Sequence, residues 1–136
     1  MVFYGKESAP GKYKSYLRER IEKCEATAFL ALNAENESIG FVLNYHSFSS
    51  VSLGKVIVLN DLYVAAEYRN QGIGQQLIER TFEFAKDWGA VRVDLGTAKT
   101  NTLAQGLYDK MGFVKDTEFY AYSFTLSHYQ PDKRSG

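Results

Sequence analysis

The feature that most constrains this chain is one run in which an apolar strand leads through a glycine-containing loop into an amphipathic helix. Residues Lys55–Val64 carry few polar positions, which is typical of a strand buried inside a sheet. Across Gly72–Trp88, apolar residues recur on one side of a helix that Gly89 would end. Val91–Leu95 then alternates apolar and charged residues, as a further strand does. A strand, a helix and a second strand in this order predict a parallel βαβ unit with a right-handed crossover.

The remaining segments predict elements that surround this unit. We expect a helix over Lys12–Cys24, two hairpin strands over Thr27–Leu32 and Ile39–Ser47, a second short helix over Asn101–Met111, and a last strand over Phe119–Leu126. Short strands alternating with helices are typical of a mixed α/β, or α+β, domain. The sequence therefore predicts a twisted central sheet flanked by helices.

Length and composition exclude several classes of protein. The 136 residues suit one domain, expected over residues 1–129 with a polar tail over residues 130–136. Lys and Arg number 16, as do Asp and Glu, and no apolar stretch approaches the ~18 residues of a membrane helix. We therefore expect neither a nucleic-acid nor a membrane partner. The single cysteine, Cys24, and the two widely spaced histidines indicate no metal site and a reducing, cytoplasmic location.

The loop between the buried strand and the long helix has the properties of an anion site. The first N–H groups of a helix have no partner inside the helix, and the helix dipole favours negative charge there. Gly72 and Gly74 lack the Cβ atoms that would keep a phosphate away from the backbone, and Arg69 supplies a cation. These residues together favour a phosphate-bearing ligand. The plain alternative is that the two glycines only permit a tight turn.

Two common phosphate motifs do not match this loop. A Walker loop ends in Gly-Lys followed by Ser or Thr, whereas Gly74 is followed by Gln75 and Gln76. A dinucleotide fingerprint needs a third glycine at the position that Leu77 occupies. The spacing therefore disfavours both nucleotide sites.

Two stretches together resemble the GNAT superfamily of N-acetyltransferases. Arg-x-x-Gly-x-Gly, after a strand that ends in Asp-Leu-Tyr-Val, is similar to the acetyl-CoA-binding motif of that family. The later stretch Asn101–Phe113 is similar to its second motif, in which an Asn, an Ala and a Tyr precede a Gly-Phe pair. The resemblance covers roughly Glu25–Leu126. Within it, Ser47–Ser50, Asn60–Val64 and Glu118–Tyr120 look most like the subgroup of histone, polyamine and small-amine acetyltransferases.

This resemblance implies a fold, a cosubstrate and a reaction. The fold is the GNAT-like sheet, with a V-shaped cleft between the central strand and the parallel strand after it. The reaction is the transfer of an acetyl group from acetyl-CoA to a primary amine of a small molecule or protein, by direct attack in a ternary complex. The backbone of residues 62–64 would meet the pantetheine and thioester, and residues 70–75 would wrap the pyrophosphate. The implied cofactor-binding residues are Leu62, Tyr63, Val64, Arg69, Asn70, Gln71, Gly72, Ile73, Gly74, Gln75, Asn101 and Tyr108.

The second helix places two of these residues on one face. Asn101, Ala104 and Tyr108 follow one another at steps of three and four. The resemblance makes Tyr108 the catalytic residue, because a phenol with a pKa of ~10 can give a proton to a departing thiolate whose acid has a pKa of ~8.5. The structural alternatives are a helix cap for Asn101 and ordinary aromatic packing for Tyr108. The neighbouring face carries residues suited to the core: Leu103, Leu107 and Met111.

The sequence assigns no general base. Many relatives have a glutamate at the position of Asn60, and an amide cannot accept the proton of the amine. Asp61 is adjacent, but strand alternation is expected to point it to the opposite face of the sheet. A water held by backbone carbonyls, or His46 on the preceding strand, are alternatives. A lone histidine such as His46 is more commonly a packing or surface residue.

The resemblance also leaves questions about the start of the chain and about its activity. Family members usually begin with a strand and one or two helices, and only Met1–Gly11 precedes the first predicted helix, so the first strand and helix are expected to be missing. An upstream start or a partner subunit would also supply this wall. An exposed sheet edge and the aromatic stretch Phe119–Leu126 favour a homodimer. Two rival functions stay open: a catalytically weak or inactive acetyl-CoA- or CoA-binding module, and a different phosphate-ligand domain that shares only the loop.

Overall fold

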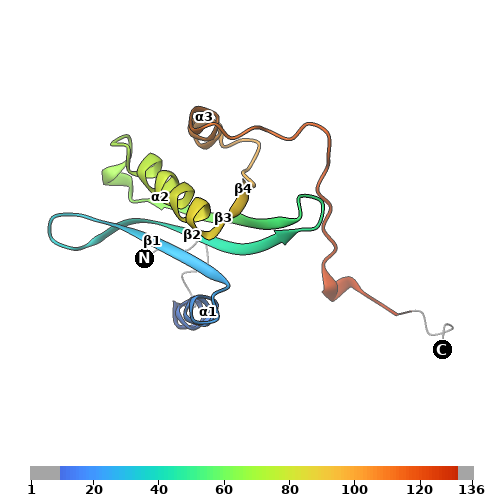
Figure 1. Cartoon of the computed structure of the whole chain (residues 1–136). Coiled ribbons are helices and arrows are strands. Elements are labelled where there is room, and N and C mark those ends of the chain that lie inside the picture. Colours follow the sequence, from blue (N-terminus) through green and yellow to red (C-terminus); the bar gives the residue numbers. More distant parts are fainter. Residues whose placement is uncertain (1–9, 132–136) are drawn as a thin grey trace.

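The computed structural model describes residues 10–131 of the chain, and expectations for residues 1–9 and 132–136 lie outside the described part. The elements of this part follow one another as in Figure 1. Their bounds are α1 Pro10–Glu22, β1 Ala26–Leu32, β2 Ser38–Ser49, β3 Gly54–Val64, η1 Ala66–Tyr68, α2 Ile73–Trp88, β4 Ala90–Leu95, α3 Thr102–Met111 and η2 Leu126–His128. All three α-helices and four strands lie close to their predicted positions, whereas the two short 3-10 helices, η1 and η2, were not expected.

The four strands form one sheet in the order β1-β2-β3-β4. β1, β2 and β3 pair antiparallel, and β3 pairs with β4 in parallel across the α2 connection. This confirms the predicted βαβ unit and the mixed sheet. β3 is an inner strand, as its apolar sequence predicts, because it lies between β2 and β4 in the sheet.

Helices cover both faces of the sheet and create two apolar clusters. Leu77 and Ile78 of α2 pack with Val42 and Leu59 of the sheet, and α3 adds side chains to the same cluster. On the opposite face, Leu17 of α1 packs against a second cluster formed by β1 and β2. Figure 1 shows α2 and α1 on opposite sides of the strands. The apolar face of α2 therefore packs against the sheet, as its amphipathic sequence predicts.

Two local expectations are corrected by the structure. The first helix ends at Glu22, so Cys24 is not helical; it is exposed and has a left-handed backbone with φ 57°. Leu103 is 89% exposed instead of facing the core, because the first turn of α3 begins beyond the end of β4 and has no sheet to pack on. Leu107 and Met111 do pack against the core.

The predicted last strand over Phe119–Leu126 is not formed, and that prediction is wrong for this structure. The segment after α3 is an extended coil that ends in η2, and Figure 1 shows it running away from the sheet. Among the described residues no strand pairs with it. Strand propensity alone is insufficient, because an extended segment becomes a strand only when a neighbour supplies the hydrogen bonds of the ladder. None of the helices in the described part is long and apolar enough to span a bilayer.

Candidate active site

A cleft opens where β3 and β4 separate. The last paired residues are Leu59 and Leu95, yet β3 continues through Val64. The first turns of α2 and α3 border the opening, which has a volume of about 1240 Å³. This is the V-shaped cleft that the resemblance implies. Its lining includes all of the predicted cofactor-binding residues except Gln71, namely Leu62, Tyr63, Val64, Arg69, Asn70, Gly72, Ile73, Gly74, Gln75, Asn101 and Tyr108.

The N-terminus of α2 faces this cleft without a side-chain cap. Gly72 is the N-cap residue, with a left-handed φ of 80°, and no side chain of the described residues hydrogen-bonds there. The helical ladder begins with the Gln76 N–H donating to the Gly72 carbonyl at 3.0 Å. A Cβ atom built on Gly72 would meet nothing within 4 Å, so the space in front of the helix is open. Open space, uncapped amides and the positive end of the helix dipole fit a pyrophosphate.

The loop before α2 is held in place by hydrogen bonds to its neighbours. Arg69 Nε donates to the Val64 carbonyl at 2.9 Å, which ties the guanidinium to the end of β3 at the rim of the cleft. Asn70 has a left-handed φ of 62°, a conformation that asparagine tolerates better than most residues. Gln71 Nε2 donates to the Glu67 carbonyl at 3.3 Å, and Gln71 does not line the cleft. The loop is therefore shaped before any ligand arrives.

Helix α3 supplies the opposite wall. Asn101 Oδ1 accepts a hydrogen bond from the Ala104 N–H at 3.2 Å, so Asn101 is the N-cap of α3 as well as a lining residue. Tyr108 is half-buried, and its ring meets Phe113 edge to face at 5.7 Å. Both structural alternatives, capping and aromatic packing, are thus present. Neither removes these residues from the cleft.

A β-bulge brings two polar side chains of β3 to the same side of the sheet. In the β2–β3 register Leu43 pairs with Asp61 while Asn44 pairs with Leu59, so Asn60 is the extra residue. A bulge reverses the alternation of the residues that follow it. The expectation that Asp61 faces away from Asn60 is therefore wrong. Both line the cleft, and Asn60 Nδ2 donates to Asp61 Oδ2 at 3.1 Å.

Asp61 lies in an environment that favours its protonated form. Burial raises the pKa of the Asp61 carboxyl above its ordinary value, and the hydrogen bond from Asn60 opposes this rise in pKa in part. A carboxylate whose pKa is raised toward neutrality holds a proton more strongly and is a better base. The reasoning from sequence considered this residue and set it aside because of strand alternation. Only the strand register could have revealed it, because the bulge has no clear local sequence signal.

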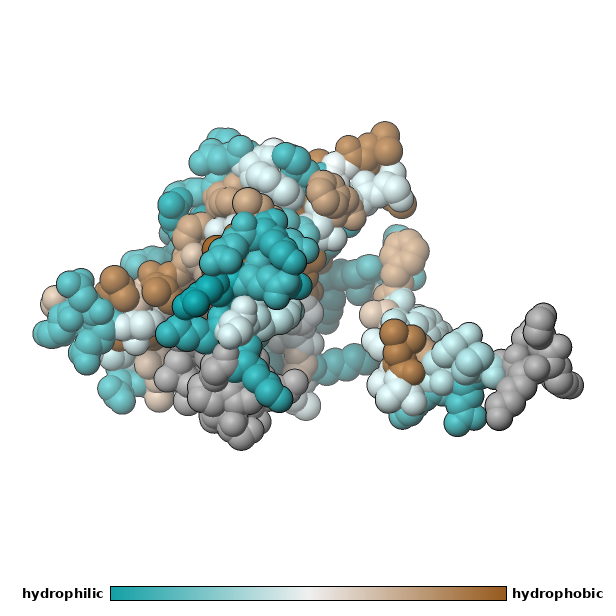
Figure 2. Space-filling view, turned by 90° about the horizontal axis from the view of Figure 1, so that it is seen from below, coloured by the Kyte–Doolittle hydropathy of each residue, from teal (hydrophilic) through white to brown (hydrophobic). Residues whose placement is uncertain are grey.

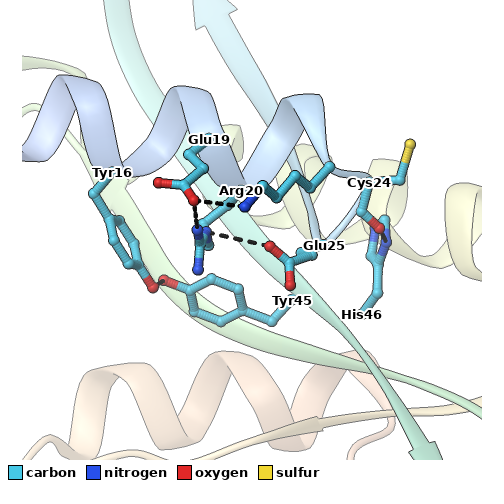
Figure 3. Close-up of polar contacts among 8 residues, drawn as sticks. Tyr16, Glu19, Arg20, Cys24, Glu25, Tyr45 and His46 are labelled. Atoms are coloured by element: carbon cyan, nitrogen blue, oxygen red, sulfur yellow. Dashed lines mark hydrogen bonds and ion pairs between the residues drawn. The ribbon is translucent and has the colours of Figure 1, made fainter.

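Two tyrosines lie on the same side of the cleft as Asp61. The hydroxyls of Tyr16 in α1 and Tyr45 in β2 are 2.8 Å apart. Figure 3 shows the two side chains pointing toward each other. Burial, and then the hydrogen bond to Tyr16, raise the pKa of Tyr45 above its usual value. Tyr45 therefore stays a neutral phenol at working pH and is not a base. Asp61 is left as the acidic side chain in the lining.

His46 has a packing role instead of a place in the cleft. Its Nδ1 donates to the Cys24 carbonyl at 2.7 Å, a contact drawn in Figure 3, and its Nε2 lies 2.7 Å from Thr27 Oγ1. The ring lies 5.6 Å from that of Phe84 and 4.8 Å from that of Trp88. His46 is absent from the residues that line the cleft in the described part. The packing interpretation of this histidine is therefore the one that the structure supports.

Comparisons with known proteins agree with this arrangement. The sequence model of the acetyltransferase (GNAT) family matches residues 3–113. An uncharacterized N-acetyltransferase of Bacillus subtilis (strain 168), YhfO, is 34% identical over 91% of this chain and 83% of its own length. A thialysine N-epsilon-acetyltransferase of Bos taurus is 39% identical over 80 residues, and the match covers 59% of this chain and 46% of that enzyme.

A solved structure shares the whole arrangement. The crystal structure of a probable acetyltransferase superposes with a TM-score of 0.80 and 35% identity, over 95% of this chain and 83% of that chain. The family match covers most of the residues, and its two motifs lie on opposite walls of one cleft. The chain therefore belongs to the acetyltransferase (GNAT) family, as an N-acetyltransferase that acts on amine substrates.

Proposed function

We propose that this chain transfers the acetyl group of acetyl-CoA to a primary amine of a small molecule or protein, by direct attack in a ternary complex. The observation that carries the proposal is a single cleft with an uncapped helix N-terminus at one part and a carboxyl of raised pKa at another. The first feature suits a pyrophosphate, and the second suits an ammonium group. The bovine relative, by its name, acetylates an ε-amine, which agrees with an amine side chain as acceptor.

The donor side of the cleft would hold acetyl-CoA, which the family implies and which supplies an acetyl thioester when bound. The amides of the first turn of α2 and the guanidinium of Arg69 would bind the pyrophosphate. The backbone of Leu62–Val64, beyond the last pair with β4, would align the pantetheine and polarise the thioester carbonyl. These groups are placed by secondary structure, so they need little reorganisation on binding.

The acceptor side would use Asp61 to bind and deprotonate the amine. An alkyl ammonium group with a pKa near ~10 must lose a proton before its nitrogen can attack a carbonyl. Asp61 accepts this proton, directly or through one water, and the new C–N bond replaces the C–S bond. The aromatic side chains of Tyr16 and Tyr45 flank the same part of the lining and suit the alkyl portion of a cationic substrate.

Tyr108 would complete the proton transfers. Its ring lines the cleft from α3, opposite the end of β3. The phenol donates a proton to the sulfur as the C–S bond breaks. The nitrogen loses one proton to Asp61 before the attack and a second proton as the amide forms. One of these two protons restores the Tyr108 phenol, and the other leaves to solvent. We also propose that the enzyme is a homodimer and acts in the cytoplasm, where its single cysteine stays reduced.

Calorimetric titration of acetyl-CoA tests the donor side. Gly72→Glu places a carboxylate in front of the α2 N-terminus and should weaken binding about tenfold or more, which corresponds to ~1.4 kcal/mol. Gln76→Glu is the matched control, because it adds the same charge to an exposed position outside the lining. Equal affinity in wild type and Gly72→Glu, with both folded by circular dichroism, would contradict the proposed pyrophosphate site.

Steady-state kinetics on a panel of amines test the chemistry. Tyr108→Phe should lower kcat about a hundredfold while leaving acetyl-CoA affinity nearly unchanged, because only the proton donor is lost. Unchanged kcat in this variant would remove Tyr108 from the mechanism. Tight acetyl-CoA binding by the wild type without transfer to any amine would instead favour the rival function, a binding module without catalysis.

A further inference from the structure

Two polar residues lie inside the apolar core between the sheet and α2. Asn44 of β2 and Thr81 of α2 are both 0% exposed, and they are the buried polar residues of the described part. Asn44 Nδ2 donates a hydrogen bond to Thr81 Oγ1 at 3.0 Å. Elsewhere hydrophilic side chains gather at the surface, as Figure 2 shows over α1. Asparagine and threonine are mostly surface residues in folded proteins, so this pair is an exception within the molecule.

The pair does not satisfy all of its own hydrogen-bonding groups. Asn44 Oδ1 is buried and accepts no hydrogen bond from the residues that the structure describes. A buried carbonyl without a donor lowers stability, and an apolar side chain of similar size would avoid this loss. A buried polar pair can instead select one packing arrangement, because other arrangements separate the two partners. Here the arrangement in question is the position of α2 on the sheet.

The neighbouring contacts between α2 and β2 are apolar or aromatic. Val42 packs in one cluster with Ile78 on one side of the pair. On the other side, the ring of His46 stacks on that of Phe84 at 5.6 Å. Contacts of this type hold α2 against the sheet, but they define its position along the strand less sharply than a hydrogen bond does.

Another hydrogen bond joins α2 to the sheet at the far end of the helix. Lys55 Nζ donates to the Trp88 carbonyl at 3.2 Å, and this contact is only partly buried. A lysine ammonium sits on a flexible four-carbon stem, so it can follow a helix that shifts. Asn44 and Thr81 have short side chains inside the core, and the bond between them therefore restrains α2 more tightly.

The pair connects the two sides of the candidate site. Asn44 directly follows Leu43, which pairs with Asp61 at the bulge. Thr81 lies in the helix whose N-cap is Gly72, nine residues earlier, which is about 13 Å along the helix axis. A shift of α2 at Thr81 also moves the N-terminus of the helix. The hydrogen bond therefore sets the position of the proposed pyrophosphate site relative to the proposed base.

We propose that Asn44 and Thr81 are positioning residues for the acetyl transfer, and that their hydrogen bond fixes α2 along β2 so that the bound thioester and Asp61 meet the same amine. The role in acetyl transfer rests on the proposed function, whereas the restraint on α2 does not. Misplacing reacting groups by about 1 Å can lower a rate about a hundredfold while each group still binds its ligand. Loss of the bond should therefore lower kcat and leave the affinity for acetyl-CoA nearly unchanged.

Steady-state kinetics of the double variant Asn44→Leu/Thr81→Val test the positioning role. This variant removes both polar partners and nearly keeps their volumes, so it should be at least as stable as the wild type in urea denaturation. We expect kcat to fall about tenfold or more, with a calorimetric affinity for acetyl-CoA within about twofold of the wild type. Thr81→Ser keeps the hydroxyl and should keep kcat. A folded double variant with the wild-type kcat would overturn the positioning role.

Ile78→Val is the matched control. Ile78 is 0% exposed, belongs to the apolar cluster between α2 and the sheet, and does not line the cleft. The control loses one methylene group and some stability but no hydrogen bond, so its kcat should equal that of the wild type. A fall in kcat as large as that of the double variant would show that any loosening of this core is sufficient, and would overturn the specific role of the pair.

NMR relaxation dispersion separates failure of this proposal from failure of the proposed function. The backbone amides of α2 should show little microsecond-to-millisecond exchange in the wild type and clear exchange in the double variant, because the helix would then sample more than one position. This measurement needs neither an amine nor acetyl-CoA. Exchange in the double variant of a protein that acetylates no amine would contradict the proposed function and support the restraint on α2. Absence of exchange in the double variant would overturn the restraint.

Discussion

At the scale of the single residue, the proposed acceptor side of the cleft depends on one extra position in β3. Asn60 is inserted into the ladder, and this insertion places Asp61 in the cleft. Without the bulge, Asn60 would face the cleft alone and its amide could not accept a proton. The bulge therefore gives the chain a carboxylate where its sequence pattern would have put none.

Replacing Asp61 with Asn should separate its role in activity from its effect on stability. We expect kcat to fall about a hundredfold, because the group that takes the proton of the amine is lost. The pKa of Asp61 is higher in the folded protein than its unfolded value of 3.8. The protonated carboxyl therefore contributes its full stabilisation below pH 3.8, and this stabilisation is lost as the pH rises through the folded-state pKa. At neutral pH Asp61→Asn should therefore be as stable as the wild type or more stable.

Urea denaturation and pH–rate profiles check this prediction. The difference in stability between wild type and Asp61→Asn should shrink as pH falls toward 3.8, and the rise of kcat/KM with pH should be absent from the variant. Asp87→Asn, at an exposed position of α2, is the control and should change neither profile. A fully active Asp61→Asn enzyme would exclude Asp61 as the base.

At the scale of the element, the N-cap residue of α3 has two roles, one in the helix and one in the cleft. Asn101 caps the helix through the Ala104 N–H, and it also lines the cleft. Asparagine is among the best residues at this position because its side-chain oxygen satisfies an amide of the first turn. Tyr108 lies two turns after Asn101, so its position depends on the helix beginning after this residue.

Substitutions at Asn101 can distinguish the cap from a ligand contact. Asn101→Ala should lose about 0.5–2 kcal/mol of stability, whereas Asn101→Ser should keep it within a few tenths because serine also caps. Urea denaturation measures this difference. If Asn101 also contacts the cosubstrate, Asn101→Ser should be stable yet bind acetyl-CoA more weakly. Equal stability of the Ala and Ser variants would show that the cap contributes little.

At the scale of the whole molecule, the described chain is a four-stranded sheet with an apolar cluster on each face and two edge strands, β1 and β4. The two apolar clusters cover the faces of the sheet. In the described part, β4 pairs with a strand on one side only and residues 119–126 pair with no strand. In the proposed homodimer, folding and assembly would be linked, because part of the apolar surface is buried only between copies.

The midpoint of thermal unfolding should therefore depend on protein concentration. We expect the wild-type midpoint to rise as concentration increases, because mass action favours the folded dimer. Tyr122→Glu/Phe124→Glu should unfold at a lower temperature that does not change with concentration. Differential scanning fluorimetry across a hundredfold dilution measures both. A midpoint for the wild type that does not move would argue against coupled assembly.

The sequence by itself determined most of the elements and the loop that we propose to bind the cosubstrate. Hydrophobic period and glycine position are local properties, so they predicted α2, the strands around it and the loop from Arg69 to Gly74. Two motifs sufficed to predict the family, and the family match agrees. The predicted core position of Leu103 failed because burial depends on where the neighbouring sheet ends, which periodicity does not encode.

Only the tertiary structure decided which residues face one another and which edges stay open. Strand register turned Asp61 into the cleft, since a bulge depends on the pairing of two strands and not on either sequence alone. Side-chain packing placed His46 against aromatic rings and away from the cleft. Residues 119–126 have the sequence of a strand and remain a coil, because a strand forms only beside a neighbour that supplies hydrogen bonds, and no such neighbour lies along them in the described chain.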